Sequence, residues 1–189
     1  MERFVMANFR REQYDRIIKN FDGFSKLEMR KMIVAAADRA ASAGVTATKK
    51  GITREFTISG GTLDKVVKKY KYGSGLEMAI GVKIRDTMRP LSEFKFSPKK
   101  HSARPTVEVK RGNRRTLQGP RFVAHVHGRI AILERTSKKS YPVRALQGPS
   151  AVGMFRANES IHQMVWDIIF NKFEERVIHE IDYKLNKKG

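Results

Sequence analysis

The sequence contains no cysteine, few acidic residues and no long apolar run. It has 19 Asp and Glu against 39 Lys and Arg in 189 residues. Without cysteine the chain can form neither a disulfide nor a thiolate nucleophile. No apolar stretch approaches the roughly 20 residues of a membrane-spanning helix, and residues 1–16 lack the apolar core of a signal peptide. These absences exclude a disulfide scaffold, a thiol enzyme and a helical membrane protein.

The deficit of acidic residues leaves a formal net charge of +20, and this charge is unevenly distributed. Residues 61–150 contain 21 basic and 6 acidic residues, a net charge of +15. Residues 1–60 carry +5, and residues 151–189 are neutral. A concentrated positive field attracts polyanions, and nucleic acid is the usual one. The alternative interpretation is that the charge only keeps the protein soluble.

A predicted β-hairpin lies at the centre of the basic region. Phe122–Val126 and Arg129–Leu133 are rich in β-branched and apolar residues, and the turn signal His127-Gly128 separates them. Tyr141–Leu146 then reads as a short extended piece. Its Pro142 cannot donate a ladder hydrogen bond, so we expect this piece at a sheet edge. We expect the rest of the chain to pack around this sheet.

Helical patterns flank the sheet region on both sides. Residues 1–24 are expected to form a helical arm. An alanine-rich helix is expected from the capping box of Ser25 and Glu28, and a short helix from Thr62 to Tyr70. A long helix from Ser160 to Leu185 would measure ~39 Å. Its apolar stripe covers the chain's own sheet or faces another subunit; the candidate subunit-interface residues are Ile161, Val165, Ile168, Ile169 and Ile181.

Three further segments read as extended. Leu76–Ile84 alternates apolar and other residues, Leu91–Phe96 places Phe94 and Phe96 on one face, and Thr106–Lys110 is a third strand. The predicted fold class is therefore α+β: a mostly antiparallel sheet flanked by an N-terminal Ala-rich helix and a long C-terminal helix. We expect one such domain over residues 25–189, preceded by the arm.

Two patterns suggest metal chemistry, and neither is complete. His125 and His127 are spaced to share one face of a strand, but no third ligand is evident. Asp86, Glu108 and Lys110 resemble the trio of a metal-dependent nuclease. Asp86 does not follow a proline, however, and an inward-facing Val107 would leave Glu108 facing solvent. We predict no catalytic, cofactor-binding or metal-binding residues, and no cofactor.

The basic stretches contain no zinc finger, basic zipper or RNA-recognition signature, and no regular aromatic interleaving. Their charge suits a duplex backbone in general and no particular base sequence. The candidate residues for contact with DNA in a channel are Lys99, Lys100, Arg104, Lys110, Arg111, Arg114, Arg115, Arg121, Lys138 and Lys139.

Two motifs carry a family resemblance. The segments Arg89–Phe94 (RPLSEF) and Tyr141–Ser150 (YPVRALQGPS) lie between an Ala-rich helix and a C-terminal helix, and a His-Gly turn precedes the second. In content and order they resemble the minor tail protein Z family of tailed phages and prophages, over roughly residues 25–160. Gln118–Phe122 departs from the Pro-Gly-Ala-Phe that is more usual in that family.

The resemblance implies a structural, non-enzymatic virion protein. Members of that family complete the tail at its head-proximal end, at the neck or head–tail connector, commonly as sixfold rings through which DNA passes. The implied partners are further copies of the chain in a homohexameric ring, a tail terminator or tail tube, neck and head-completion proteins, and double-stranded DNA. Assembly would occur in the cytoplasm of the bacterial host, without a membrane. A free nucleic-acid-binding protein without sequence preference stays as the alternative.

Overall fold

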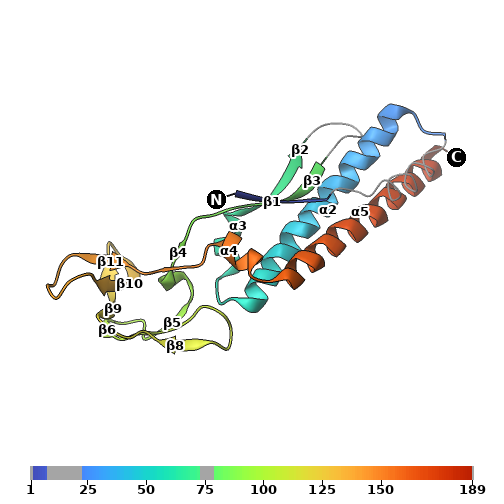
Figure 1. Ribbon diagram of the computed structural model, residues 1–189. Helices are drawn as coiled ribbons and strands as arrows, with labels where there is room; N and C mark the ends of the chain where they lie inside the picture. The colour runs from blue at the N-terminus through green and yellow to red at the C-terminus, as the bar shows by residue number, and fades with distance from the viewer. Residues whose placement is uncertain (1, 8–22, 73–78, 189) are drawn as a thin grey trace. The chain divides into compact units, whose positions relative to one another are not determined.

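The computed structural model describes residues 2–7, 23–72 and 79–188, and the chain divides into two compact units (Figure 1). Unit 1 comprises Lys49–Val66 and Arg85–Ala157, and unit 2 comprises Glu2–Thr48, Val67–Ile84 and Asn158–Gly189. The sequence analysis expected a single domain over residues 25–189. The fold is nevertheless α+β as predicted, with antiparallel sheets, an alanine-rich helix on the N-terminal side and a long C-terminal helix.

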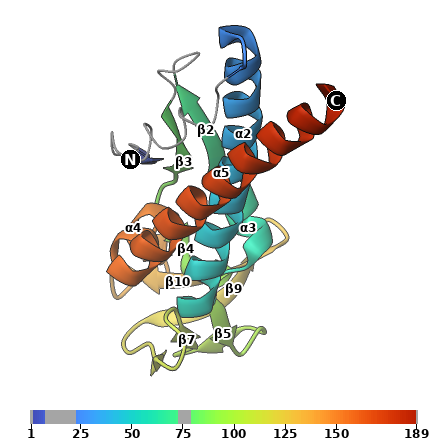
Figure 2. The same ribbon diagram turned by 90° about the vertical axis from the view of Figure 1, so that its right-hand side faces the viewer.

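Unit 2 is built on two long helices and a three-stranded sheet. Most of α2 (Lys26–Glu55) and all of α5 (Glu159–Lys188) belong to it, and the two helices lie side by side in both views (Figures 1 and 2). The strands are ordered β1 (Glu2–Ala7), β3 (Ala79–Arg85) and β2 (Val67–Tyr72). The buried side chains of α5 recur at every fourth position: Ile161, Val165, Ile169, Phe173, Val177 and Ile181.

That spacing corrects the predicted subunit interface. Four of the five candidates, Ile161, Val165, Ile169 and Ile181, are at most 5% exposed. Because they are buried within the chain, they are not available to a neighbouring subunit. Ile168 alone among the five reaches the surface, with 36% exposure.

Small residues on α2 allow the two helices of unit 2 to pack closely. Ala36, Ala37, Ala40 and Ala41 are fully buried. One turn further, a Cβ on Gly44 would lie 2.5 Å from Cγ1 of Ile169 and 3.1 Å from a methyl of Val82 in β3. Glycine is unfavourable in the interior of a helix. Helix α2 nevertheless continues through Gly44, where only glycine leaves room for Ile169.

The helix starts were predicted in part. The capping box is confirmed: the backbone N–H of Glu28 donates to Ser25 Oγ, and the N–H of Ser25 donates to Glu28 Oε2. Helix α5 begins at Glu159, one residue before the predicted Ser160. Both the N–H and the hydroxyl of Ser160 donate to Oδ1 of Asn158, which therefore caps this helix.

The predicted helix from Thr62 to Tyr70 is wrong. Ser59 caps a short helix, α3 (Gly60–Asp64), and its hydroxyl accepts from the N–H of Thr62. Val67–Tyr72 is strand β2, which pairs antiparallel with β3 in the register Val67↔Ile84. Pairing with β3, in which apolar residues alternate, favours a strand here more than the weak helical spacing of the segment favours a helix.

The described part of the expected N-terminal arm, Glu2–Ala7, is strand β1 and not helix. The residues on which that helix prediction depends, 14–21, lie outside the described residues, as do residues 76–78 at the start of the predicted strand Leu76–Ile84. The remainder of that strand is confirmed as β3.

Unit 1 consists of short antiparallel strands and short helices. The larger sheet has the order β11 (Val143–Ala145), β10 (Arg129–Arg135), β9 (Arg121–Val126) and β6 (Ser102–Ala103). The smaller has the order β5 (Lys95–Ser97), β7 (Thr106–Glu108) and β8 (Arg114–Thr116), and β12 (Gln147–Gly148) pairs with β4 (Arg89–Pro90). A 3₁₀ turn, Leu91–Glu93, precedes β5, and α4 (Ala151–Arg156) follows β12. Phe96, Val107, Val123 and Ile132 form the core between the two sheets.

The predicted hairpin is confirmed as β9 and β10. His127 and Gly128 both have positive φ, +50° and +73°, as a tight two-residue turn requires. The piece after Pro142 is confirmed at a sheet edge, as β11. The predicted strand at Thr106 is β7, and Phe94 and Phe96 are both buried as expected. The expectation that the whole chain packs around this hairpin fails, because both long helices have most of their length in unit 2.

Candidate nucleic-acid interface

The positive charge is as concentrated in one structural unit as it is in residues 61–150 of the sequence. Unit 1 contains 21 Lys and Arg against 6 Asp and Glu, a net charge of +15. Unit 2 contains 18 basic and 13 acidic residues, a net charge of +5. Three quarters of the excess charge therefore lies on one half of the protein.

The carboxylates of unit 1 do not neutralise its surface, because each forms an ion pair within the unit. Asp86, Glu108 and Glu134 lie in strands or turns, whereas Glu55, Asp64 and Glu93 lie in helices or a 3₁₀ turn. The pairs are Glu55–Lys110, Asp64–Lys49, Asp86–Arg89, Glu93–Arg89, Glu108–Lys95, Glu134–Arg121 and Glu134–Arg144. The unit has 21 basic residues for these six carboxylates, so most of its positive charge is not offset within the unit.

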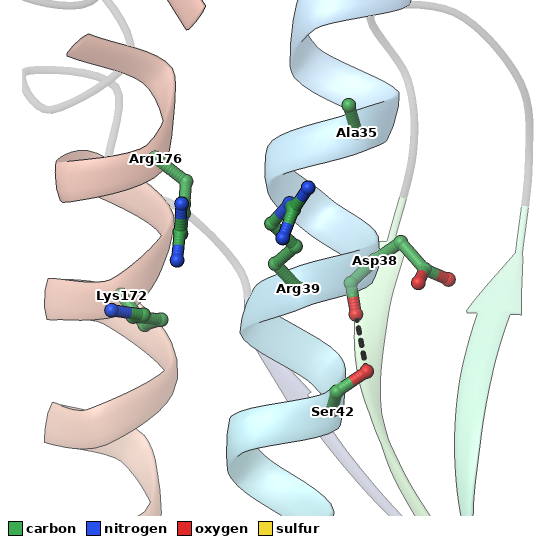
Figure 3. A pocket seen from close by; sticks show the side chains of 6 residues that line it. All are labelled: Ala35, Asp38, Arg39, Ser42, Lys172 and Arg176. Atoms are coloured by element: carbon green, nitrogen blue, oxygen red, sulfur yellow. Dashed lines mark hydrogen bonds between the residues drawn. The ribbon is translucent and has the colours of Figure 1, made fainter. Parts of the chain in front are cut away.

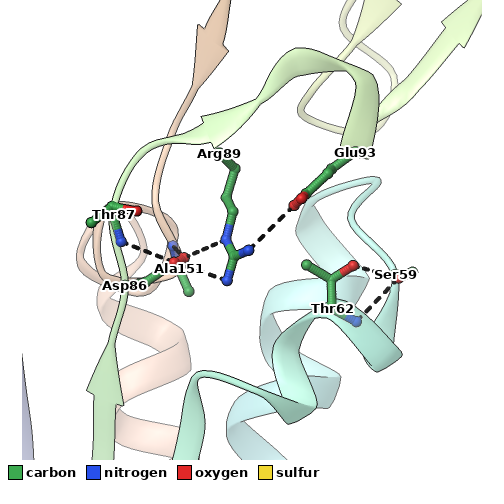
Figure 4. Close-up of polar contacts among 7 residues, drawn as sticks. All are labelled: Ser59, Thr62, Asp86, Thr87, Arg89, Glu93 and Ala151. Atoms are coloured by element: carbon green, nitrogen blue, oxygen red, sulfur yellow. Dashed lines mark hydrogen bonds and ion pairs between the residues drawn. The ribbon is translucent and has the colours of Figure 1, made fainter. Parts of the chain in front are cut away.

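Asp86 is the most buried of these acids, and its role is structural (Figure 4). One carboxylate oxygen accepts from the N–H of Thr87 and the Nη2 of Arg89, both at 2.9 Å. The other accepts from the Nε of Arg89 at 2.9 Å and the N–H of Ala151 at 2.8 Å. Since Ala151 is the first residue of α4, Asp86 ties the chain after β3 to the start of that helix.

Glu134 lies at the centre of a cation–carboxylate–cation ladder across three strands. Arg144 of β11 and Arg121 of β9 are directly opposite Glu134 of β10. Arg121 Nε donates to Oε1 at 2.9 Å, and Arg144 Nη2 donates to Oε2 at 2.6 Å. The hydrogen bonds from Arg144, and then those from Arg121, hold the pKa of Glu134 below its ordinary value. Arg121 is half-buried, and its guanidinium is engaged by Glu134 within the sheet.

The ladder marks the end of the larger sheet where basic residues gather. The N–H of Arg104 donates to the carbonyl of Arg121, and Arg135 lies opposite Val143, beside Arg144. The connection from β10 to β11 leaves from this same end. We call this set the basic sheet end; its members are Arg104, Arg121, Arg135, Lys138, Lys139 and Arg144, with Glu134 as the one acid among them.

The loop of the basic sheet end is held in shape by its own hydrogen bonds. Thr136 donates to the carbonyl of Pro142 from both its N–H and its hydroxyl. Arg135 Nη1 donates to the carbonyl of Ser140, and its guanidinium lies over the ring of Phe122 at 4.9 Å. Lys138 and Lys139 are exposed on this ordered loop. Long cationic side chains on a fixed backbone suit contact with phosphates.

The smaller sheet carries basic residues on both faces. Arg114 lies in register with Glu108 and Lys95, on the face away from the core, and Arg115 lies in register with Val107. Arg115 lines a groove of about 310 Å³ whose polar lining also includes Lys110 and Asn113. Its apolar floor is formed by Leu91, Val107, Val109 and Leu117. Arg114 and Arg115, which were both predicted to contact DNA, therefore lie on opposite faces of the sheet and do not both face one DNA channel.

The remaining residues that were predicted to contact DNA differ in their surroundings. Lys99 lies over the ring of Phe96 at 3.4 Å, and partial burial lowers its pKa. Lys100 is exposed, and Arg111 is exposed while its Nε donates to the carbonyl of Thr53. The sequence analysis missed Arg135 and Arg144, which belong to the same cluster. Their positions at the two ends of the β10–β11 connection were the signal that could have found them.

The metal and nuclease alternatives gain no support from the geometry. His125 lies on β9, whereas His127 sits in the turn, so the two do not share a strand face. Glu108 accepts from the N–H of Gly112 and pairs with Lys95, and these contacts, in that order, lower its pKa. Asp86 is committed to Arg89 and α4. Within the described ranges, no group of three His, Cys, Asp or Glu is placed to hold a metal ion.

Comparison with protein families, with curated proteins and with solved structures finds no match to this chain. Among the helices of residues 23–72 and 79–188, none combines the length and apolar character needed to cross a bilayer.

Proposed function

We propose that this chain is a structural protein of a tailed-phage particle that contacts DNA, completing the tail and joining it to the neck or head as a ring around the DNA path. One observation carries the proposal: unit 1 has a net charge of +15, and all six of its carboxylates are already paired within it. The order of the motifs at Arg89–Phe94 and Tyr141–Ser150 supports the place in the particle.

The basic sheet end is the part of unit 1 best suited to a phosphate backbone. Its members come from neighbouring segments of the larger sheet. Four of the six are exposed, and the other two, Arg121 and Arg135, are half-buried. Cations on a duplex backbone displace condensed counterions and read no base sequence. Such contacts hold a duplex while allowing it to pass, which is what a DNA channel requires.

Ring formation is the second element of the proposal, and it requires side chains other than the predicted ones. Ile161, Val165, Ile169 and Ile181 are used within unit 2. The exposed apolar residues of α5 are Ile168, Ile178, Tyr183 and Leu185. A heterologous contact that closes after a fixed rotation would produce a ring.

Cryo-EM of assembled particles tests the position. We expect density for this chain as a ring at the head–tail joint, with unit 1 lining the DNA path. A copy located at the baseplate, or a ring with unit 1 facing outward, would contradict the proposal.

A free nucleic-acid-binding protein without sequence preference is the second candidate, since the charge of unit 1 favours it equally. Light scattering combined with duplex titration separates the two. A chain that stays monomeric at all concentrations and still binds DNA tightly, with a steep salt dependence, favours the free protein. Assembly into a closed ring favours the virion role.

A further inference from the structure

Unit 2 contains a basic groove between α2 and α5, away from the residues discussed so far. Its volume is about 570 Å³ (Figure 3). Helix α2 contributes Ala35, Asp38, Arg39 and Ser42, and α5 contributes Lys172 and Arg176. Three of the six lining residues are cations, in a unit whose overall charge is nearly balanced.

Asp38, the one acidic residue that lines this groove, does not pair with its arginines. Asp38 points away from α5 and accepts from Lys69 at 2.9 and 3.0 Å, while it also pairs with Lys71 at 2.8 Å (Figure 3). These two lysines lower the pKa of Asp38, Lys69 contributing most. The carboxylate is therefore ionised and committed to β2.

The two arginines line the groove without a bonded carboxylate, although the charge of Glu175 lies close enough to interact with that of Arg176. Arg39 on α2 and Arg176 on α5 line the same groove from its two sides, and the guanidinium of Arg176 extends along α5 toward Lys172 (Figure 3). Neither forms a salt bridge or hydrogen bond with any other residue in the described part of the chain, and the buried Nε of Arg176 lacks an acceptor there. A buried donor without an acceptor and two cations that line one groove both cost free energy.

We propose that this groove binds a phosphate-type oxyanion held between Arg39 and Arg176. Guanidinium groups bind such an anion through paired N–H donors, and two of them from facing helices offer four or more donors to its oxygens. Lys172 lies on the same wall. Its ammonium bonds both oxygens of Glu175 at 2.7 Å, which places a third cation beside the site at a fixed position. The anion satisfies the Nε of Arg176 and removes the repulsion between the helices.

This inference is independent of the proposed function, because it concerns unit 2 and requires no DNA. The test is thermal unfolding of the full chain in inorganic phosphate, with chloride added to hold ionic strength constant. We expect saturating phosphate to raise Tm by at least about 4 °C. The same series with pyrophosphate and with a short DNA duplex distinguishes a free phosphate from a phosphate of nucleic acid.

Two variants make the test specific. In Arg176→Gln and Arg39→Gln we expect the phosphate-dependent shift to disappear, while Tm without phosphate stays equal to that of the wild type or rises, since one positive charge of the groove is removed. Arg176→Lys keeps the positive charge but lacks the paired N–H donors of a guanidinium, so it should retain part of the phosphate-dependent rise in Tm. Arg30→Gln, on the exposed face of α2, is the matched control and should retain all of it.

Two results would overturn the inference. The first is an unchanged wild-type Tm, or a shift that survives in both glutamine variants, which would place the phosphate elsewhere on this basic protein. The second is a loss of Tm in Arg176→Gln without phosphate, which would mean that the arginine stabilises the fold by itself.

Discussion

At the residue scale, the acidic side chains of unit 1 are structural nodes. Asp86 accepts four hydrogen bonds and Glu134 joins three strands, whereas the basic residues greatly outnumber such partners. The sequence marked Asp86 and Glu108 as potential metal ligands because spacing alone does not reveal the partner of a carboxylate. Each of them also has a partner from another segment, Ala151 for Asp86 and Lys95 for Glu108, and the spacing does not reveal it.

We expect Asp86→Asn to lower the free energy of unfolding by about 3 kcal/mol, because the buried Arg89 would lose the nearer of its two carboxylates and keep only Glu93, at 3.6 Å. Urea denaturation of the two proteins measures the difference. Asp64→Asn is the control: its pair with Lys49 is half exposed, and its loss should cost less than about 1 kcal/mol. Equal small effects for both variants would contradict the structural role of Asp86.

Gly44→Ala should destabilise unit 2 even though alanine favours helix by about 1 kcal/mol over glycine. The added methyl group would lie 2.5 Å from a side-chain atom of Ile169 that is fully buried and cannot move aside. We expect a net loss of about 1–3 kcal/mol in urea denaturation. Gly61→Ala in α3 meets no atom within 4 Å and should be neutral or stabilising. Stabilisation by Gly44→Ala would show that the two helices are not packed this closely.

At the element scale, local patterns predicted the segments whose structure depends on local chemistry. The Ser25–Glu28 capping box, the His127-Gly128 turn and the edge strand after Pro142 were all found where expected. Strand β2 was missed, because Val66, Val67 and Tyr70 satisfy helical spacing equally well. Only its pairing with β3 decides between the two, and that pairing is not visible in the segment itself.

The ladder of Glu134 predicts how the larger sheet responds to acid. A carboxyl group whose pKa is lowered on folding adds stability above its ordinary value of 4.5, and this contribution is lost as the pH falls through the lower folded value. We therefore expect Glu134→Gln to reduce Tm at pH 7 and to show a smaller further loss than the wild type below about pH 4.5. Parallel Tm curves for the two proteins from pH 7 to pH 3 would contradict this assignment.

At the scale of the whole molecule, the sequence predicted approximately where the basic charge lies, but it did not predict the boundaries of unit 1. Lys68, Lys69 and Lys71 belong to unit 2, whereas Lys49 and Arg54 at the end of α2 belong to unit 1. No composition change along the chain marks a boundary that falls inside a helix. The unit boundaries separate a half of the molecule with a net charge of +15 from a half with a net charge of +5.

The central claim is that unit 1, and chiefly its basic sheet end, binds a nucleic-acid backbone. The most direct test measures duplex affinity against salt for two variants that each lose three exposed cations. One variant replaces Arg104, Lys138 and Lys139 by glutamine, and the other replaces Lys31, Lys68 and Lys187 of unit 2. We expect the slope of log K against log salt to fall by about 2–3 in the first variant and to stay unchanged in the second. Equal slopes for the two variants would contradict the account, since the charge of unit 1 would then have no special role in binding.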